Sequence, residues 1–171
     1  VLFLAEAAVS LAQSPEVPHK MNVAGIMLTL RDDARREIQK DVDALTQSPR
    51  YFNVKAERAR TYFPIIERIF KEERVPDDLK YLVLQESALI ADAVSSSNAV
   101  GFWQFKDMTA REMGLRVDEQ IDERMNIVSA SRGAAKYFRQ SNNYFNNWIH
   151  VVQSYQMGIG GARNVIPEDD I

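Results

Sequence analysis

From residue 31 onward, the apolar residues of this chain recur at the three- and four-residue spacing of α-helices. Each series marks one face of a helix, and such faces have to pack against one another. Prolines, glycines and polar runs separate the series, and no convincing strand pattern follows residue 30. The pattern therefore predicts a compact all-α domain. The expected inward positions are Ala34, Ile38, Val42 and Leu45; Ile65, Ile66, Ile69 and Phe70; Ile127, Ala130, Ala134, Tyr137 and Phe138; and Trp148, Val151, Val152 and Tyr155.

Prolines and polar runs also predict where the helices end. Ser48-Pro49 is expected to end the first helix, and a second is expected over 54–61. Pro64 suits the first turn of a third helix. A longer helix is expected over 122–140, with the run "NNYFNN" forming the turn that follows it.

The segment 13–30 carries a different signal. It contains Pro15, Pro18 and Gly25, which interrupt any long helix. Its apolar residues alternate too irregularly to indicate a strand with any force. A linker or extended arm is therefore expected there.

Composition excludes several classes of function. The 171 residues suit one domain, and the net charge of −3 gives no electrostatic basis for binding nucleic acid. The chain has no cysteine and only two histidines, His19 and His150, which lie far apart in the sequence. Disulfides, thiolate nucleophiles and a metal site are not expected, and neither is a cofactor.

The first residues indicate export. Residues 1–12 are largely apolar, and Ser10-Leu11-Ala12 has the small-x-small form of a signal-peptidase site. This favours a signal-peptide remnant at 1–12, although Glu6 also suits a short amphipathic helix. No later segment is long and apolar enough for a membrane span.

Glu86 stands out among the acidic residues. Leu79, Leu82, Val83 and Glu86 fall at i, i+3, i+4 and i+7, so the carboxyl shares the stripe that faces the core. Desolvation and the helix C-terminus both raise the pKa of such a carboxyl, which favours the protonated form that a general acid needs. The alternative is a half-exposed glutamate that bonds a loop amide.

The loop after Glu86 contains Gly101-Phe102-Trp103-Gln104-Phe105. Aromatic faces pack on the C–H faces of sugar rings, and an amide can bond hydroxyl or acetamido groups. The pentapeptide is therefore a candidate sugar site, with a core aromatic cluster as the alternative.

Four short stretches together resemble a known family. They are, in chain order, Glu86-Ser87, then Gly101-Phe102-Trp103-Gln104, then Asn126-Ile127, then Ser154-Tyr155-Gln156-Met157-Gly158. This set is similar to the "ES", "GLMQ", "NI" and "AYNxG" motifs of the lysozyme-like soluble lytic transglycosylases, glycoside hydrolase family 23. The form "GFWQ" is closest to the membrane-bound murein transglycosylase D type.

The resemblance implies a compact lysozyme-like catalytic domain over 51–171, with a helical extension over 31–50. It implies cleavage of the β-1,4 bond between N-acetylmuramic acid and N-acetylglucosamine in peptidoglycan without added water, leaving 1,6-anhydromuramic ends. Glu86 would act alone as general acid and then base. Glycan strands would be the partner, in the periplasm or cell envelope of a Gram-negative bacterium, with the enzyme a monomer.

Further roles follow from motif position. Ser87 and Gln104 resemble ligands of the sugar or of the loop, and Tyr155 resembles the residue that bonds the catalytic glutamate. The chain departs from the family pattern at Ser154 and Gln156, where Gln supplies an amide on a longer arm than Asn. Among the remaining candidates, Phe102 and Trp103 are expected to shape the substrate groove, whereas Ser95, Gly101 and Asn126 are expected to support the structure.

Three rival interpretations remain open at this stage. A hydrolase of the goose-lysozyme kind would need a second carboxylate, and Asp92 is the nearest candidate. A catalytically inactive peptidoglycan-binding module would keep the fold without the chemistry. A helical interaction protein would make the motif set a coincidence.

Overall fold

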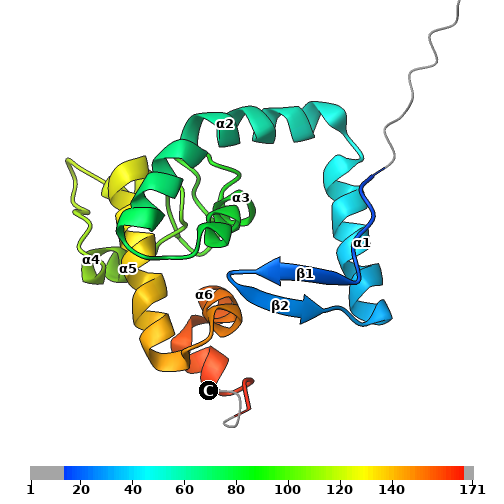
Figure 1. The fold of residues 1–171 in the computed structure, drawn as a ribbon. Helices are drawn as coiled ribbons and strands as arrows, with labels where there is room; N and C mark the ends of the chain where they lie inside the picture. Colours follow the sequence, from blue (N-terminus) through cyan, green and yellow to red (C-terminus); the bar gives the residue numbers. More distant parts are fainter. Residues whose placement is uncertain (1–13, 168–171) are drawn as a thin grey trace, which may run out of the picture.

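The computed structural model describes residues 14–167, so the signal-peptide expectation at 1–12 lies outside the described residues. The described chain is mainly helical, as predicted, with one small sheet (Figure 1). Its elements are β1 (Lys20–Val23), β2 (Ile26–Thr29), α1 (Asp32–Thr46), α2 (Pro49–Glu72), the 3₁₀ helix η1 (Asp77–Tyr81), α3 (Leu82–Glu86), α4 (Asp107–Glu112), the 3₁₀ helix η2 (Glu123–Met125), α5 (Ile127–Phe145) and α6 (Trp148–Arg163).

The core forms where α2 packs along α5. Ile66, Ile69 and Phe70 of α2 are fully buried, as are Ala134 and Phe138 of α5. The small alanine side chains on α5 let the two helix backbones approach closely. These are inward positions that the helical spacing predicted for α2 and α5.

The inward face predicted for α1 is not buried in this way. Ala34, Ile38 and Val42 are only half-buried, and Leu45 is 45% exposed. The reason is that α1 lies outside the main core, so its apolar stripe has few side chains to pack against.

Helix α2 is longer than predicted. The sequence pattern favoured two helices divided before Pro64, but one helix runs from Pro49 to Glu72 with Pro64 inside it. Figure 1 shows that α2 bends along its length. Proline removes one backbone hydrogen bond and bends a helix. The carbonyl that Pro64 leaves unpaired is that of Arg60, and both residues are exposed, so water can bond it.

The turn predicted at "NNYFNN" is also displaced. Helix α5 continues to Phe145, and Asn146, at φ 47°, then ends it in the left-handed conformation. Phe145 is buried against Ala162 and Ile166, which explains why the helix extends through a polar run. Asn147 starts α6 by accepting a hydrogen bond from the Ile149 backbone N–H at 2.9 Å.

Residues 20–29 form a β-hairpin where a linker or arm was expected. The strands pair antiparallel, from Lys20 with Thr29 to Val23 with Ile26. Ala24 and Gly25 make the two-residue turn, both at positive φ. Such turns favour Asn-Gly, so Ala-Gly gives a weak signal in the sequence. The Ala24 N–H donates to Asp78 Oδ2 at 2.6 Å, so the hairpin tip docks on η1.

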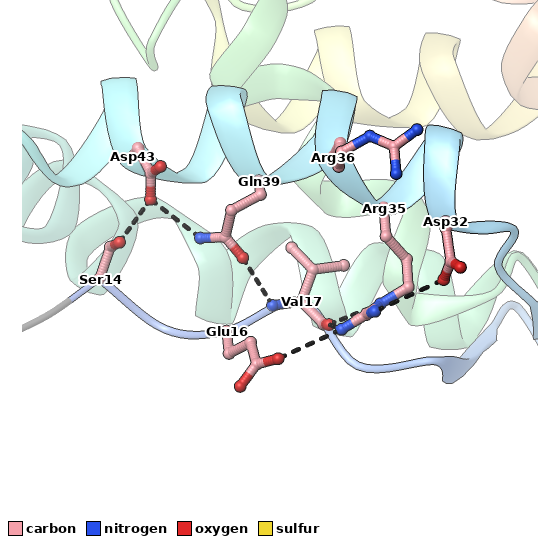
Figure 2. A pocket seen from close by; sticks show the side chains of 8 residues that line it. All are labelled: Ser14, Glu16, Val17, Asp32, Arg35, Arg36, Gln39 and Asp43. Carbon is pink, nitrogen blue, oxygen red and sulfur yellow. Dashed lines mark hydrogen bonds and ion pairs between the residues drawn. The ribbon is translucent and has the colours of Figure 1, made fainter.

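The segment before the hairpin lies along α1 and is hydrogen-bonded to it (Figure 2). Gln39 donates to the Pro15 carbonyl at 3.0 Å and accepts from the Val17 N–H at 2.9 Å. The Arg35 guanidinium donates to the Val17 carbonyl, and the Ser14 hydroxyl bonds Asp43. The pocket drawn in Figure 2 is the space between this segment and α1.

Within residues 14–167, no helix combines the length and the apolar character that crossing a membrane requires.

Candidate active site

Glu86 is the last residue of α3, and its carboxyl is half-buried. Leu79 and Val83 are buried in the core as predicted, but the single α-helix that the spacing implied is divided, with Leu79 in the 3₁₀ helix η1 and Val83 and Glu86 in α3. Gln156 of α6 donates a hydrogen bond from Nε2 to Glu86 Oε1 at 2.5 Å. The carboxyl therefore lies where α3 meets α6, held by a neutral amide.

The chain turns sharply after Glu86. Ala88 and Leu89 both adopt the left-handed conformation, with φ of 51° and 59°. Non-glycine residues rarely do so, because the conformation costs about 1–2 kcal/mol per residue. The turn buries Leu89 in the core, and Arg58 of α2 donates to the Ala88 carbonyl at 3.3 Å. The core and α2 thus fix the end of the segment that carries the carboxyl.

Burial raises the pKa of Glu86 above its ordinary value, because the desolvated carboxylate is less stable than the neutral acid. The hydrogen bond from Gln156 acts in the opposite direction and lowers the pKa, since the amide donor favours the carboxylate. Burial is the larger effect. The carboxyl therefore keeps its proton to a higher pH than an exposed glutamate does.

The loop from Gly101 to Phe105 is held by groups next to Glu86 and Gln156. The Ser87 hydroxyl donates to the Phe102 carbonyl at 2.7 Å, and the Tyr155 hydroxyl donates to the Trp103 carbonyl at 2.6 Å. Gln104, at φ 51°, bends its amide back to the carbonyls of Ala93 and Gly101, at 3.0 and 2.9 Å. Ser87 and Gln104 thus order the loop, which was one of the two roles that the sequence left open.

Phe102 and Trp103 do not line a groove, which corrects the sequence expectation. Their exposed fractions are 2% and 1%, and both belong to the main core. The Trp103 indole N–H donates to the buried Ser131 hydroxyl at 3.0 Å. Phe70 and Phe138 pack around the indole, and Tyr62 packs edge-on to Phe102. The alternative of a core aromatic cluster is the correct one.

Tyr155 also differs from its expected role. Its hydroxyl donates to the Trp103 carbonyl, and Gln156 donates to the Glu86 carboxyl. Burial, with the nearby Glu86 charge as a smaller cause, raises the pKa of Tyr155 well above its ordinary value, so the phenol stays a donor. Gln156 reaches the carboxyl from the next position of the same motif.

The three residues that were expected to support the structure each contact or constrain the backbone. Asn126 caps α5, because its Oδ1 accepts from the N–H groups of Val128 and Ser129, both at 3.0 Å. The Ser95 hydroxyl accepts from the Ala99 N–H at 3.0 Å. Gly101 has φ +85°, and a Cβ there would lie 1.9 Å from the Arg124 carbonyl oxygen.

Two residues of the site's framework were not predicted from the sequence. Arg124 is buried, and its guanidinium donates to the Phe105 carbonyl at 3.2 Å while pairing with Asp122. Ser131 receives the Trp103 indole N–H. Neither residue belongs to the four short motif stretches. A charged residue beside a turn, such as Arg124, is expected to be solvated, and only the folded structure shows that it is buried. Ser131 lies four residues after Ile127, so helical spacing offered a weak signal.

Among residues 14–167, no group of three or more His, Cys, Asp or Glu side chains could hold a metal ion. Asp92, the candidate second carboxylate, is exposed.

Comparison with known proteins extends these observations. The family model for the Transglycosylase SLT domain matches residues 63–170. Two proteins named "Membrane-bound lytic murein transglycosylase D", one from Escherichia coli strain K12 and one from Escherichia coli O6:H1, are each 31% identical over 110 residues. The aligned part covers 64% of this chain and 24% of each relative, so the chain spans about a quarter of their length.

Replacing Gly101 by Ala should destabilise the fold by about 3 kcal/mol, because the new Cβ overlaps the Arg124 carbonyl and the backbone is strained. Gly114→Ala is the matched control: Gly114 has φ +94° but nothing within 4 Å of its Cβ position, so strain alone should cost about 1–2 kcal/mol. Urea unfolding of both variants measures the difference. Equal losses would mean that the Arg124 contact is unimportant.

Replacing Glu86 by Gln should stabilise the protein increasingly as the pH rises. The pKa of Glu86 is higher in the folded protein than in the unfolded chain. The free energy of unfolding of the wild type therefore falls as the pH rises from the unfolded pKa to the folded pKa. The glutamine does not titrate. The difference in free energy of unfolding, measured by urea denaturation from about pH 4 to about pH 8, should grow with pH. A constant difference, or one that shrinks, would contradict the assigned burial.

Replacing Gln156 by Leu should raise the pKa of Glu86 further, because it removes the donor that favours the carboxylate. A ¹³C NMR titration of the side-chain carboxyls measures the shift directly. Gln153→Leu is the control, since Gln153 is exposed on the same helix and its amide contacts His150. An unchanged titration in Gln156→Leu, or an equal change in both variants, would remove Gln156 from the site.

Proposed function

Since this chain belongs to the Transglycosylase SLT domain family, we propose that it is a peptidoglycan lytic transglycosylase with Glu86 as its general acid and base. The substrate bond would be the β-1,4 linkage between N-acetylmuramic acid and N-acetylglucosamine. The relatives are named as murein transglycosylases, which supports this substrate. The division of the chain into an extension over 31–50 and a catalytic domain over 51–171 is part of the same proposal.

One observation carries the proposal. A half-buried carboxyl with a raised pKa lies where three motif segments meet, and it accepts a hydrogen bond from a neutral amide rather than from a cation. A glutamate paired with arginine would stay ionised and could not donate a proton. Glu86 can do so at the pH at which an exposed glutamate is already deprotonated.

In the first step, protonated Glu86 gives its proton to the glycosidic oxygen as the bond from that oxygen to muramyl C1 breaks. The leaving sugar departs as a neutral alcohol. Positive charge develops at C1, and the acetamido oxygen of the muramyl residue itself can stabilise it. Glu86 is left as a carboxylate, which the Gln156 amide favours through its hydrogen bond.

In the second step, that carboxylate removes the proton from the muramyl C6 hydroxyl. The C6 oxygen then forms a bond to C1 and closes the 1,6-anhydro ring. Glu86 regains the proton that it gave up, so the enzyme returns to its starting state. No water enters, which explains why a single carboxyl suffices where hydrolases use two.

The goose-type hydrolase is the main alternative. It needs a carboxylate that activates water, and Asp92 would have to supply it. Asp92 is exposed on the loop after Glu86. The two functions give products that differ by one water, so their masses separate them.

The cellular setting belongs to the proposal as well. The relatives are named membrane-bound and come from Escherichia coli, which supports an exported protein that acts in the periplasm or cell envelope of a Gram-negative bacterium. We expect the protein to act as a monomer without nucleic acid.

Digestion of purified peptidoglycan, read by mass spectrometry, tests the mechanism. Wild type should release muropeptides with 1,6-anhydromuramic ends, each one water lighter than the hydrolytic products. Glu86→Gln should lose about 10²–10⁴-fold in rate, because the amide neither donates nor accepts the proton.

Asp92→Asn is the matched control and should retain wild-type activity. Products heavier by one water, with activity lost in Asp92→Asn, would establish the hydrolase instead. Binding to isolated sacculi without any released muropeptide would establish an inactive module.

A further inference from the structure

Arg58 of α2 is a half-buried cation beside the segment that carries Glu86. Its Nη1 donates to the Ala88 carbonyl at 3.3 Å. Ala88 follows Glu86 by two residues, and two residues of chain span at most about 7 Å. The guanidinium is therefore held close to the end of α3, where the candidate catalytic carboxyl lies.

The charge of Arg58 is not matched by a carboxylate of the described chain. Three arginines among residues 14–167 are buried or half-buried, namely Arg35, Arg58 and Arg124. Arg35 and Arg124 each pair with an aspartate. Within the same range, Arg58 forms no ion pair and donates only to the Ala88 carbonyl. A cation that loses part of its hydration is costly without an anion, so Arg58 lacks a partner that the other two have.

The acidic residues nearest in sequence do not compensate this charge. Glu57 precedes Arg58 on α2, but its carboxylate pairs with Arg60. Arg60 is two residues, or about 200° of helix rotation, beyond Arg58, so this pair draws the Glu57 carboxylate to the opposite side of α2. Asp92, on the loop after Glu86, is exposed and forms no ion pair in the described part of the chain. The positive charge is thus left for a group outside the protein.

The face of α2 that carries Arg58 continues beside the loop of the site. Lys55, Arg58 and Tyr62 follow at i, i+3 and i+7, and all three are half-buried. Tyr62 packs edge-on to Phe102 of that loop, with the ring centroids 4.9 Å apart. This face therefore borders the site with two cations and an aromatic ring.

The proposed substrate contains the kind of group that Arg58 lacks. Each muramyl residue has a lactyl carboxyl at C3, which is either free or joined through an amide to a peptide that has carboxylates of its own. A guanidinium fork bonds a carboxylate through two parallel N–H groups.

We propose that Arg58 binds a carboxylate of the muramyl substituent, with Lys55 adding attraction from the preceding turn of α2. This inference rests on the proposed peptidoglycan substrate, but it does not depend on the acid and base roles of Glu86.

Calorimetric titration of the protein with soluble glycan fragments tests the inference. All proteins in this measurement carry Glu86→Gln, which prevents cleavage. Three fragments are compared. The first has intact peptide stems, the second has lost its stems to an amidase and has free lactyl carboxyls, and the third has stems whose carboxyls are converted to methylamides. The third fragment carries no carboxylate and is the neutral arm.

Replacing Arg58 by Gln should weaken binding of a carboxylate-bearing fragment about tenfold or more, because a charged two-point contact is lost. Binding of the neutral fragment should not change. Arg58→Lys should recover part of the loss, since lysine keeps the charge without the fork. Arg60→Gln is the matched control, because it removes the same charge from the same helix and should leave all three affinities unchanged.

The pattern of losses identifies the source of the carboxylate. A loss confined to the stem-bearing fragment assigns a carboxylate of the peptide, one confined to the amidase-treated fragment assigns the lactyl carboxyl, and a loss with both means that either group reaches Arg58. Equal weakening of all three fragments would overturn the inference, because Arg58 would then act through the Ala88 carbonyl alone. So would unchanged binding in Arg58→Gln, or an equal effect of Arg60→Gln.

Digestion of the same fragments by the protein with Glu86 intact separates this inference from the proposed function. Anhydromuramic products from any fragment would support the lytic activity, and equal binding losses in the calorimetry would still overturn the role of Arg58. Absence of cleavage with every fragment would remove the proposed activity, and the calorimetry would still decide whether Arg58 recognises a carboxylate.

Discussion

Two hydroxyl groups that bond the carbonyls of Phe102 and Trp103 are the constraint on which the site depends. The Ser87 hydroxyl holds the first carbonyl and the Tyr155 hydroxyl holds the second. Each is the sequence neighbour of a residue in the carboxyl–amide pair, Glu86 and Gln156. One residue of each motif therefore fixes the loop, and its neighbour faces the other motif. The loop cannot shift without moving α3 relative to α6.

This arrangement balances two opposing effects on one carboxyl. Burial against the core favours the protonated acid, and the Gln156 amide favours the carboxylate. A group that must first give and then take a proton needs both forms within reach. An arginine in place of Gln156 would trap the carboxylate, whereas an apolar side chain would trap the acid. The longer arm of glutamine, compared with the usual family asparagine, still brings a neutral donor to Oε1.

The sequence allowed the buried faces of α2 and α5 to be predicted, because burial on a helix repeats with a fixed period, whereas the same period on α1 marked a face that the fold leaves outside the core. It did not allow the orientation of Phe102 and Trp103 to be predicted, since a loop has no such period and the same aromatics suit a core or a groove. The docking of Trp103 on Ser131 depends on a helix that is distant in sequence. The hairpin was not predicted because alanine rarely adopts the left-handed conformation that Ala24 has in the turn. A contact with Asp78, which is distant in sequence, supports this conformation.

The N-terminal arm connects the two ends of the molecule. Its hairpin tip bonds Asp78 on η1, and η1 leads directly into α3, whose last residue is Glu86. Its other end lies along α1, where Ser14 bonds Asp43 near the α1–α2 joint. Helix α2 runs from that joint into the core beside α5 (Figure 1). The N-terminal arm is therefore tied to the segment that carries Glu86 by a hydrogen bond at η1, and to the core through helix α2.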